Sequence, residues 1–209
     1  MRCASVQGRV LFAVALALLG CTERDQPAPV RCAPAPTEPV PAAAAFDRYR
    51  RPDLLIAALG LRGGERVADI GAGRGYLSFR LAQAIGADGS LVATDIDAKA
   101  LAALSARAAC ERGGGAHIDV RKVPSDEPGL PKDHYDLILM SEVDHQLSSR
   151  TAYLRRLRPY LAGGGRLVVS NRRGSREALR RAALAAGFIE LGEDHSLPAH
   201  FLLFFGVHS

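Results

Sequence analysis

Three features are missing from this sequence of 209 residues: a long apolar run, cysteines at metal-ligand spacing and an internal repeat. Residues 10–19 form an apolar run of ten residues, which as a helix would extend about 15 Å, half of a bilayer's hydrocarbon core. We therefore expect no membrane-spanning helix. The four cysteines predict no metal site. The net charge of +5 gives little indication of nucleic-acid binding, and no aromatic residues are interleaved in the basic cluster from Arg172 to Arg181.

The N-terminus nevertheless has the pattern of a bacterial export signal. Arg2 and Arg9 flank a short stretch that leads into the apolar residues 10–19, and the sequence Leu-Leu-Gly-Cys then ends at Cys21. This arrangement resembles the lipobox of bacterial lipoproteins, in which cleavage precedes a lipid-modified cysteine. We expect residues 1–20 to be a lipoprotein signal peptide and a lipidated Cys21 to anchor the protein in the cell envelope, on the periplasmic face of the membrane. The alternative is a misassigned start codon, which would leave the protein in the cytoplasm.

Residues 21–45 are rich in proline and alanine, a composition that cannot bury a hydrophobic core. We expect this segment to be a disordered tether and residues 46–209 to form one domain. A disulfide between Cys32 and Cys110 is open to an exported protein, but it is not favoured because it would join the tether to a predicted helix.

The sequence VADIGAGRGY, residues 67–76, places a short apolar strand before a turn that contains three glycines: Gly71, Gly73 and Gly75. Glycine allows left-handed backbone angles and a close approach of the backbone to a ligand. Asp69 should end the strand with its carboxylate facing the ligand crevice, where it would repel a phosphate and suit a cationic ligand. The spacing is D-x-G-x-G-x-G; the dinucleotide fingerprint would need a glycine in place of Tyr76.

A second acid follows at a distance typical of nucleoside binding. Residues 90–95 read as a strand that ends in Asp95, about 20 residues beyond the glycine loop, where a carboxylate can accept hydrogen bonds from both ribose hydroxyls. A plain cap or turn acid is the alternative for Asp95, and Asp97 is expected to cap the next helix. Residues 135–140 are an apolar run typical of a central parallel strand, ending at Ser141 on the edge where ligands bind.

These motifs, in this order, resemble the class I S-adenosylmethionine-dependent methyltransferases from about Pro52 to the C-terminus. The resemblance implies an α/β fold: a Rossmann-like seven-stranded mixed sheet with helices on both faces and a C-terminal antiparallel hairpin. It implies S-adenosylmethionine as the cofactor, with Ile96 covering the adenine and Asp126 meeting its amino group. Glu127 competes with Asp126, and both acids are equally readable as solvated loop charges. The expected cofactor-binding residues are Asp69, Gly71, Gly73, Gly75, Tyr76, Asp95, Ile96, Asp126 and Ser141.

The same resemblance indicates where an acceptor would react. The methyl group of S-adenosylmethionine is already activated, so the protein mainly aligns a nucleophile and excludes water. His145 follows the fourth strand, where many small-molecule enzymes of this class carry a His-His-Leu run, and it is the candidate general base. Ordering of its loop is the alternative. Glu142 and Asp144 either bind a cationic acceptor or start a helix, and Tyr49 either helps to close the site or packs on the surface.

Absent motifs narrow the acceptor. The Asn-Pro-Pro-aromatic motif of enzymes that methylate planar amide or adenine nitrogens is missing after residue 140. No tyrosine has a lysine four residues on, as a short-chain reductase requires, and an aminopropyl transferase would want a more acidic pocket. We expect methyl transfer to a small-molecule or lipid-like acceptor; the alternative is a non-catalytic envelope protein that keeps the fold as a ligand-binding module.

Basic residues gather around one predicted helix near the C-terminus. A solvated helix face is the favoured interpretation, and attraction to anionic lipid headgroups is the alternative. The five residues are Arg172, Arg173, Arg176, Arg180 and Arg181.

Overall fold

The computed structural model describes residues 47–48, 50–111, 113–131, 134–172 and 174–208. The predicted signal peptide, the lipidated Cys21, the tether and Tyr49 lie outside these residues, so what was expected of them stays a prediction. Cys110 is disulfide-bonded. Cys32, the partner that the sequence leaves open for it, also lies outside the described residues.

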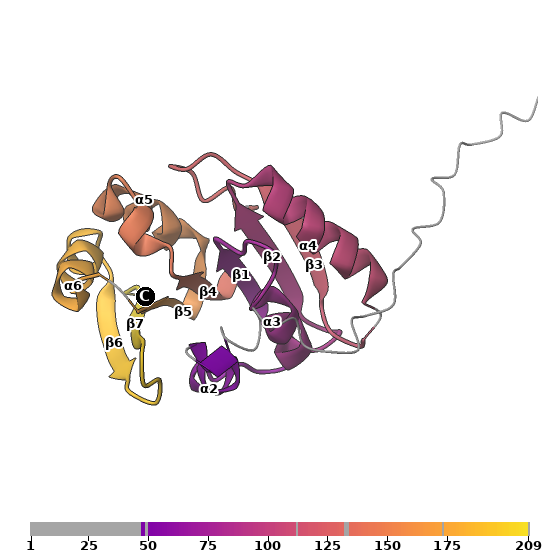
Figure 1. Ribbon diagram of the computed structural model, residues 1–209. Helices are drawn as coiled ribbons and strands as arrows, with labels where there is room; N and C mark the ends of the chain where they lie inside the picture. Colours follow the sequence, from indigo (N-terminus) through magenta and orange to yellow (C-terminus); the bar gives the residue numbers. More distant parts are fainter. Residues whose placement is uncertain (1–46, 49, 112, 132–133, 173, 209) are drawn as a thin grey trace, which may run out of the picture. The chain divides into compact units, whose positions relative to one another are not determined.

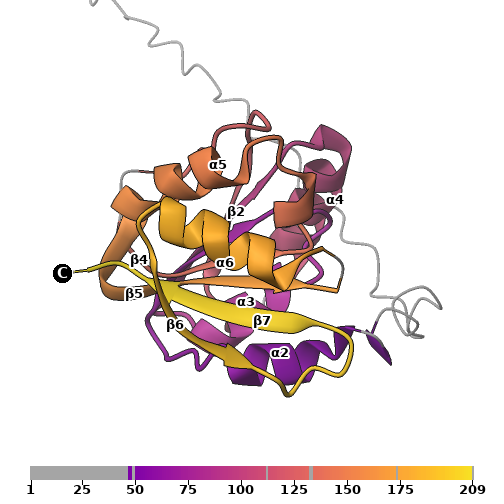
Figure 2. The same ribbon diagram turned by 90° about the vertical axis from the view of Figure 1, so that its left-hand side faces the viewer.

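One mixed sheet forms the centre of the described domain and confirms the predicted fold class. Its strand order is β3-β2-β1-β4-β5-β7-β6. Strands β1 to β5 are parallel, and β7 runs antiparallel to both β5 and β6. The C-terminal hairpin therefore closes one edge of the sheet, with β7 inserted next to β5 (Figure 2). The strands are β1 (Arg66–Ile70), β2 (Ser90–Asp95), β3 (His117–Lys122), β4 (Tyr135–Ser141), β5 (Leu161–Asn171), β6 (Ile189–Asp194) and β7 (Phe201–Gly206).

Helices pack on both faces of this sheet, and alternate strand residues meet different helices (Figure 1). One apolar cluster joins the sheet to α5 (Arg150–Leu157) and α6 (Arg176–Ala185). The opposite face packs against α2 (Pro52–Ala58), α3 (Ser78–Ile85) and α4 (Ala98–Cys110). Because helices cover both faces, β4 carries the continuous apolar run Leu137-Ile138-Leu139-Met140 that its sequence predicted.

The helix boundaries follow local signals in most places. Pro52 opens α2 at its first position, and the Asp97 carboxylate caps α4 by accepting from the N–H groups of Lys99 and Ala100 at 2.8 and 3.2 Å. Leu154, Leu157 and Leu161 recur at helical spacing, which predicts a helix through Leu161, but the helix ends earlier. A short 3-10 turn, Arg158–Tyr160, follows α5, and Leu161 already belongs to β5, where it pairs with Tyr135.

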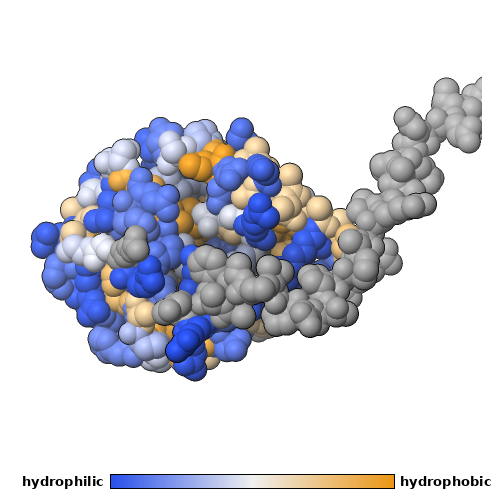
Figure 3. Space-filling view, in the orientation of Figure 1, coloured by the Kyte–Doolittle hydropathy of each residue, from blue (hydrophilic) through white to orange (hydrophobic). Residues whose placement is uncertain are grey.

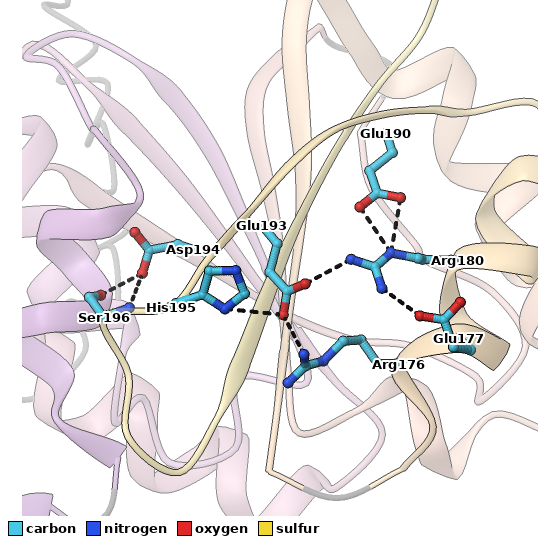
Figure 4. Close-up of polar contacts among 8 residues, drawn as sticks. All are labelled: Arg176, Glu177, Arg180, Glu190, Glu193, Asp194, His195 and Ser196. Carbon is cyan, nitrogen blue, oxygen red and sulfur yellow. Dashed lines mark hydrogen bonds and ion pairs between the residues drawn. The ribbon is translucent and has the colours of Figure 1, made fainter.

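The arginines of α6 attach this helix to β6. Arg180 contacts three carboxylates, at 2.9 Å to Glu190, 2.6 Å to Glu177 and 2.7 Å to Glu193 (Figure 4). Arg176 lies 3.0 Å from Glu193 as well. These pairs neutralise much of the basic helix face, which favours a structural role for it over a lipid-binding one.

The described helices include none that is long and apolar enough to cross a bilayer. Figure 3 shows a mostly hydrophilic face, on which apolar side chains form small groups among polar ones.

Candidate functional site

Buried polar side chains gather at one edge of the sheet. The carboxyl ends of β1, β2, β4 and β5 lie there, together with the start of β7 and the start of α3. Burying polar groups costs free energy, so their concentration at one edge is typical of a functional site and not of a packed core. The buried polar and charged residues of the described chain are Asp69, Ser78, Thr94, Asp144, Ser170, Asn171 and His200.

A cavity of about 470 Å³ opens at the same edge. Six of the expected site residues line it: Gly71, Gly73, Tyr76, Asp95, Ile96 and Ser141. A larger cavity of about 750 Å³ lies between α3, α4 and β3, but small apolar residues and glycines dominate its wall. None of the expected site residues lines that larger cavity, so we assign the site to the smaller one.

The three glycines of the loop have different structural roles. All have positive φ angles, of 75° at Gly71, 56° at Gly73 and 81° at Gly75. A Cβ at Gly71 would lie 2.2 Å from Val143, and one at Gly75 would lie 2.0 Å from Leu104, so both glycines are required by packing. A Cβ at Gly73 would meet no protein atom within 4 Å. Gly73 is therefore the glycine at which the backbone is open to a ligand.

Asp95 fixes the loop as well as facing the cavity. Its Oδ2 accepts from the N–H of Gly73 at 2.8 Å, and its Oδ1 accepts from the N–H of Asp97 at 2.9 Å. Each carboxylate oxygen can accept a second hydrogen bond. Asp95 thus ties the end of β2 to the loop after β1 and keeps the capacity to bind a vicinal diol, the role that its position predicted. Next to it, the side chain of Ile96 is 57% exposed, which is unusual for isoleucine and suits a surface that a planar ligand covers.

Asp69 does not face the crevice, and this expectation was wrong. The residue is 2% exposed and does not line the cavity; its Oδ2 accepts from the Ser78 hydroxyl at 2.6 Å. Strand residues alternate between the two faces of a sheet, and Asp69 shares the face of Val67, which packs with α3. Burial raises the pKa of the Asp69 carboxyl to about 6, while the Ser78 hydrogen bond opposes this rise. Asp69 therefore holds the start of α3 under the loop.

Tyr76 connects the loop to the segment that precedes α2. Its hydroxyl donates to Asp47, and the guanidinium groups of Arg50 and Arg80 lie 5.3 and 4.9 Å from the centre of its ring. Arg50 itself lines the cavity. The N-terminal segment thus reaches the site through Arg50 and Asp47, as expected for a segment that folds over a ligand.

The loop after β3 contributes Ser125 to the cavity wall in place of Asp126. Asp126 is exposed, and its backbone carbonyl accepts from Arg156. His145 is also exposed, in the 3-10 turn Asp144–Gln146, and does not line the cavity. The roles proposed for Asp126 and His145 stay predictions. Asp144 is buried and lies 2.8 Å from Arg150 at the start of α5, so it fixes the turn and is not free to bind an acceptor.

Glu142 is the acid of this segment that lines the cavity. Its φ of 60° is unusual for a residue other than glycine, and its N–H donates to the Ser170 carbonyl at 2.8 Å. The carboxylate Oε1 accepts from the N–H of Arg172 at 2.6 Å and lies 3.0 Å from His200 Nε2. Burial lowers the pKa of His200, although the nearby Glu142 opposes this, so the imidazole is neutral and donates its Nε2–H to Glu142.

Sequence reasoning missed several residues of the cavity wall. Gln146 and Leu147 follow His145 in the same loop, and their closeness in sequence to the end of β4 is the signal that could have identified them. Thr94 directly precedes Asp95 at the end of β2 and could have been identified in the same way. Arg50 carries no signal of its own, because its place in the wall depends on how the N-terminal segment packs.

Comparisons with known proteins agree with this geometry. Residues 68–167 match a family described as a methyltransferase domain, and this stretch contains the glycine loop, Asp95 and Glu142. The chain is 30% identical over 114 residues to the ubiquinone/menaquinone biosynthesis C-methyltransferase of Cellvibrio japonicus, covering 54% of this chain and 45% of that protein. It is 32% identical over 108 residues to the aklanonic acid methyltransferase of a Streptomyces species, covering 52% and 48%. The chain thus spans about half the length of the curated relatives it matches.

Solved structures share the fold at lower sequence identity. A SAM-dependent methyltransferase from Aquifex aeolicus superposes with a TM-score of 0.69 at 18% identity, covering 77% of this chain and 92% of that chain. The cyclase SpnF superposes with a TM-score of 0.61 at 23% identity, covering 72% and 60%. At these identities the likeness concerns the fold alone, and the second structure shows that this fold also carries a protein described as a cyclase.

Proposed function

We propose that this chain, whose residues 68–167 form an S-adenosylmethionine-dependent methyltransferase domain, transfers a methyl group to a small-molecule or lipid-like acceptor while anchored to a membrane. The observation that carries the methyl transfer is the hydrogen bond of 2.8 Å between the open glycine, Gly73, and Asp95 at the cavity. It brings a ligand-accessible backbone and a diol-binding carboxylate together.

The residues of the cavity fit S-adenosylmethionine, which supplies a methyl group activated on a sulfonium sulfur. Asp95 would bind the ribose hydroxyls, and the exposed Ile96 together with Ser125 would border the adenine. Gly73 would meet the amino-acid part through its open backbone, and Arg50 and Arg74 in the wall offer positive charge to a carboxylate. This chain's own contribution is thus to bind, orient and shield from water, which is what an activated methyl donor requires.

Membrane anchoring is the part of the proposal that rests on sequence. Arg2, Arg9 and the apolar residues 10–19 precede Cys21 in the order of a lipoprotein signal, and the proline-rich residues after it would span the distance to the domain. Labelling of the full chain with a radioactive fatty acid in a bacterial host tests this. Incorporation that Cys21→Ser abolishes would support the anchor, and an unlabelled protein would refute it.

Calorimetric titration of the full chain in detergent with S-adenosylmethionine and, separately, with NADH tests the cofactor. We expect saturable binding of S-adenosylmethionine alone. Asp95→Ala should weaken this binding by about 1 to 3 kcal/mol, because the ribose hydroxyls lose a charged partner. Asp119→Ala removes an exposed acid that pairs with Arg121 on β3, away from the cavity wall, and should leave the affinity unchanged.

Absence of binding to a folded wild-type chain would favour the alternative, a non-catalytic envelope module. The acceptor is then approached by screening for release of S-adenosylhomocysteine. Quinones, lipids and small envelope metabolites are the first compounds to screen, because a membrane anchor would place the domain next to them.

A further inference from the structure

Glu142 is held in an unusual conformation by three contacts from two separate segments. Its φ of 60° lies in the left-handed region, which is strained for a residue with a side chain. The Ser170 carbonyl and the Arg172 N–H, both at the end of β5, bind its N–H and its Oε1. His200, which precedes β7, lies 3.0 Å from the same oxygen. Strain of this kind persists when the surroundings fix it, and it is typical of functional positions.

The other oxygen of this carboxylate is free. Within the described residues, no donor is hydrogen-bonded to Glu142 Oε2, whereas both oxygens of Asp95, the other carboxylate of the wall, accept backbone N–H groups. The Glu142 side chain is 20% exposed and belongs to the cavity wall. Glu142 thus presents one pre-oriented, unsatisfied acceptor to the cavity.

The two carboxylates of the cavity wall lie at the ends of different strands. Asp95 ends β2, the glycine loop follows β1, and Glu142 follows β4, and these strands are neighbours in that order. Two strand spacings amount to about 10 Å. A nucleoside whose ribose is bound at Asp95 therefore directs its 5′ substituent, the end that carries the transferable methyl group, towards β1 and β4.

We propose that Glu142 is the carboxylate that meets the reacting atom of the acceptor, which is an amine or hydroxyl bearing a hydrogen. This proposal rests on the proposed function. The acceptor donates its N–H or O–H to Glu142 Oε2, and its lone pair forms the new bond to the methyl carbon. The carbon–sulfur bond breaks with its electron pair left on sulfur, and the acceptor's proton passes to Glu142.

His200 acts through Glu142 as a positioning residue. Its side chain is 4% exposed and does not line the cavity, so it contacts no acceptor. By donating its Nε2–H to Oε1, the neutral imidazole occupies that oxygen and leaves Oε2 available to the acceptor.

Two analogues test the proposal without knowledge of the acceptor. Sinefungin has an amine-bearing carbon in place of the methyl-bearing sulfonium, so its amine occupies the region of the reacting atoms, whereas S-adenosylhomocysteine has nothing there. Calorimetry on the full chain should show that sinefungin binds at least tenfold more tightly than S-adenosylhomocysteine. Glu142→Gln keeps Oε1 as an acceptor and the shape of the side chain, and it should abolish this preference while changing S-adenosylhomocysteine binding less than threefold.

Matched variants separate contact from general disturbance. Glu111→Gln, an exposed glutamate paired with Arg107 at the end of α4, should keep the full preference. His200→Ala should reduce the preference, and His200→Gln, which restores an N–H donor, should recover most of it.

Each contrary result has a distinct meaning. A folded wild-type chain that binds neither analogue would refute both the proposed function and this inference. Binding of both analogues without a preference, or a preference that survives Glu142→Gln, overturns this inference and leaves the cofactor assignment intact. Equal weakening of both analogues by Glu142→Gln also overturns it, because the carboxylate would then contact a part that the analogues share.

Discussion

Replacing single glycines of the loop by alanine should separate folding from ligand binding. A Cβ at Gly75 would lie 2.0 Å from Leu104 and 2.9 Å from Phe79, and the backbone there has a φ of 81°. Left-handed strain costs about 1 to 2 kcal/mol and overpacking a further 1 to 3 kcal/mol. The lower entropy of the unfolded alanine chain returns about 0.4 to 1 kcal/mol. Gly75→Ala should therefore lower the free energy of unfolding by about 1 to 5 kcal/mol.

Gly73→Ala should behave in the opposite way. Its φ of 56° carries the same strain, but its Cβ meets no protein atom within 4 Å, so the free energy of unfolding should fall by about 1 kcal/mol at most. The added methyl group would stand where the backbone is open to the cavity. We expect the affinity for S-adenosylmethionine to fall at least tenfold, which corresponds to about 1.4 kcal/mol.

Urea denaturation and calorimetric titration of the same preparations measure the two effects. Gly64→Ala is the matched control, because Gly64 has a φ of 82° and open space around it but does not line the cavity. It should reproduce the stability change of Gly73→Ala and leave affinity unchanged. Equal destabilisation by Gly73→Ala and Gly75→Ala, or wild-type affinity in Gly73→Ala, would refute the assignment of Gly73 as the ligand-facing glycine.

Three further predictions follow from burial and charge. Burial raises the pKa of the Asp69 carboxyl from 3.8 to about 6, so ionisation of this group destabilises the folded protein fully above pH 6 and not at all below pH 3.8. Asp69→Asn removes this effect. Relative to wild type, the free energy of unfolding of the variant, measured in urea, should be about 2 kcal/mol higher at pH 7 than at pH 4. Ile96→Ser should weaken S-adenosylmethionine binding about tenfold in calorimetry and change the unfolding free energy by under about 0.5 kcal/mol, because the side chain is 57% exposed. Arg180→Met should cost about 1 to 3 kcal/mol in urea denaturation, since three carboxylates lose their partner, whereas Arg181→Met on the exposed face should cost under about 0.5 kcal/mol.

Each of these predictions can fail in a recognisable way. A pH-independent effect of Asp69→Asn would mean that the carboxyl is not desolvated in the folded protein. A large loss of stability in Ile96→Ser would make Ile96 part of the core. Equal effects of the two arginine substitutions would show that the contacts of Arg180 with β6 do not stabilise the hairpin.

The sheet could be predicted because its signals are local. Apolar runs, glycines after strands and acids at strand ends predicted the order of strands and helices, and Asp97 and Pro52 marked helix starts correctly. The start of β5 at Leu161 could not be predicted in this way. Leucine at helical spacing favours continuation of α5, and the pairing of Leu161 with Tyr135 depends on the neighbouring strand.

The candidate site likewise contains residues that local sequence signals predict and residues that they do not. Gly71, Gly73 and Asp95 line the cavity, and each belongs to a short motif that the sequence shows, whereas Gly75 packs against Leu104. The burial of Asp69 could have been foreseen from strand alternation, since it shares a face with Val67. The contact between Glu142 and His200 could not, because it joins residues 58 positions apart and depends on β7 lying beside β5.

The conformation of Glu142 indicates which property of this residue the site requires. Glycine at this position would remove the left-handed strain at no steric cost, and the N–H bond to the Ser170 carbonyl would remain. What glycine would remove is the carboxylate, together with its contacts to the Arg172 N–H and His200. Among the described residues, those two contacts engage a single oxygen, Oε1, and leave Oε2 without a hydrogen-bond donor. The strain is therefore explained by the need for an oriented carboxylate at the end of β4, next to the loop that is open to the ligand.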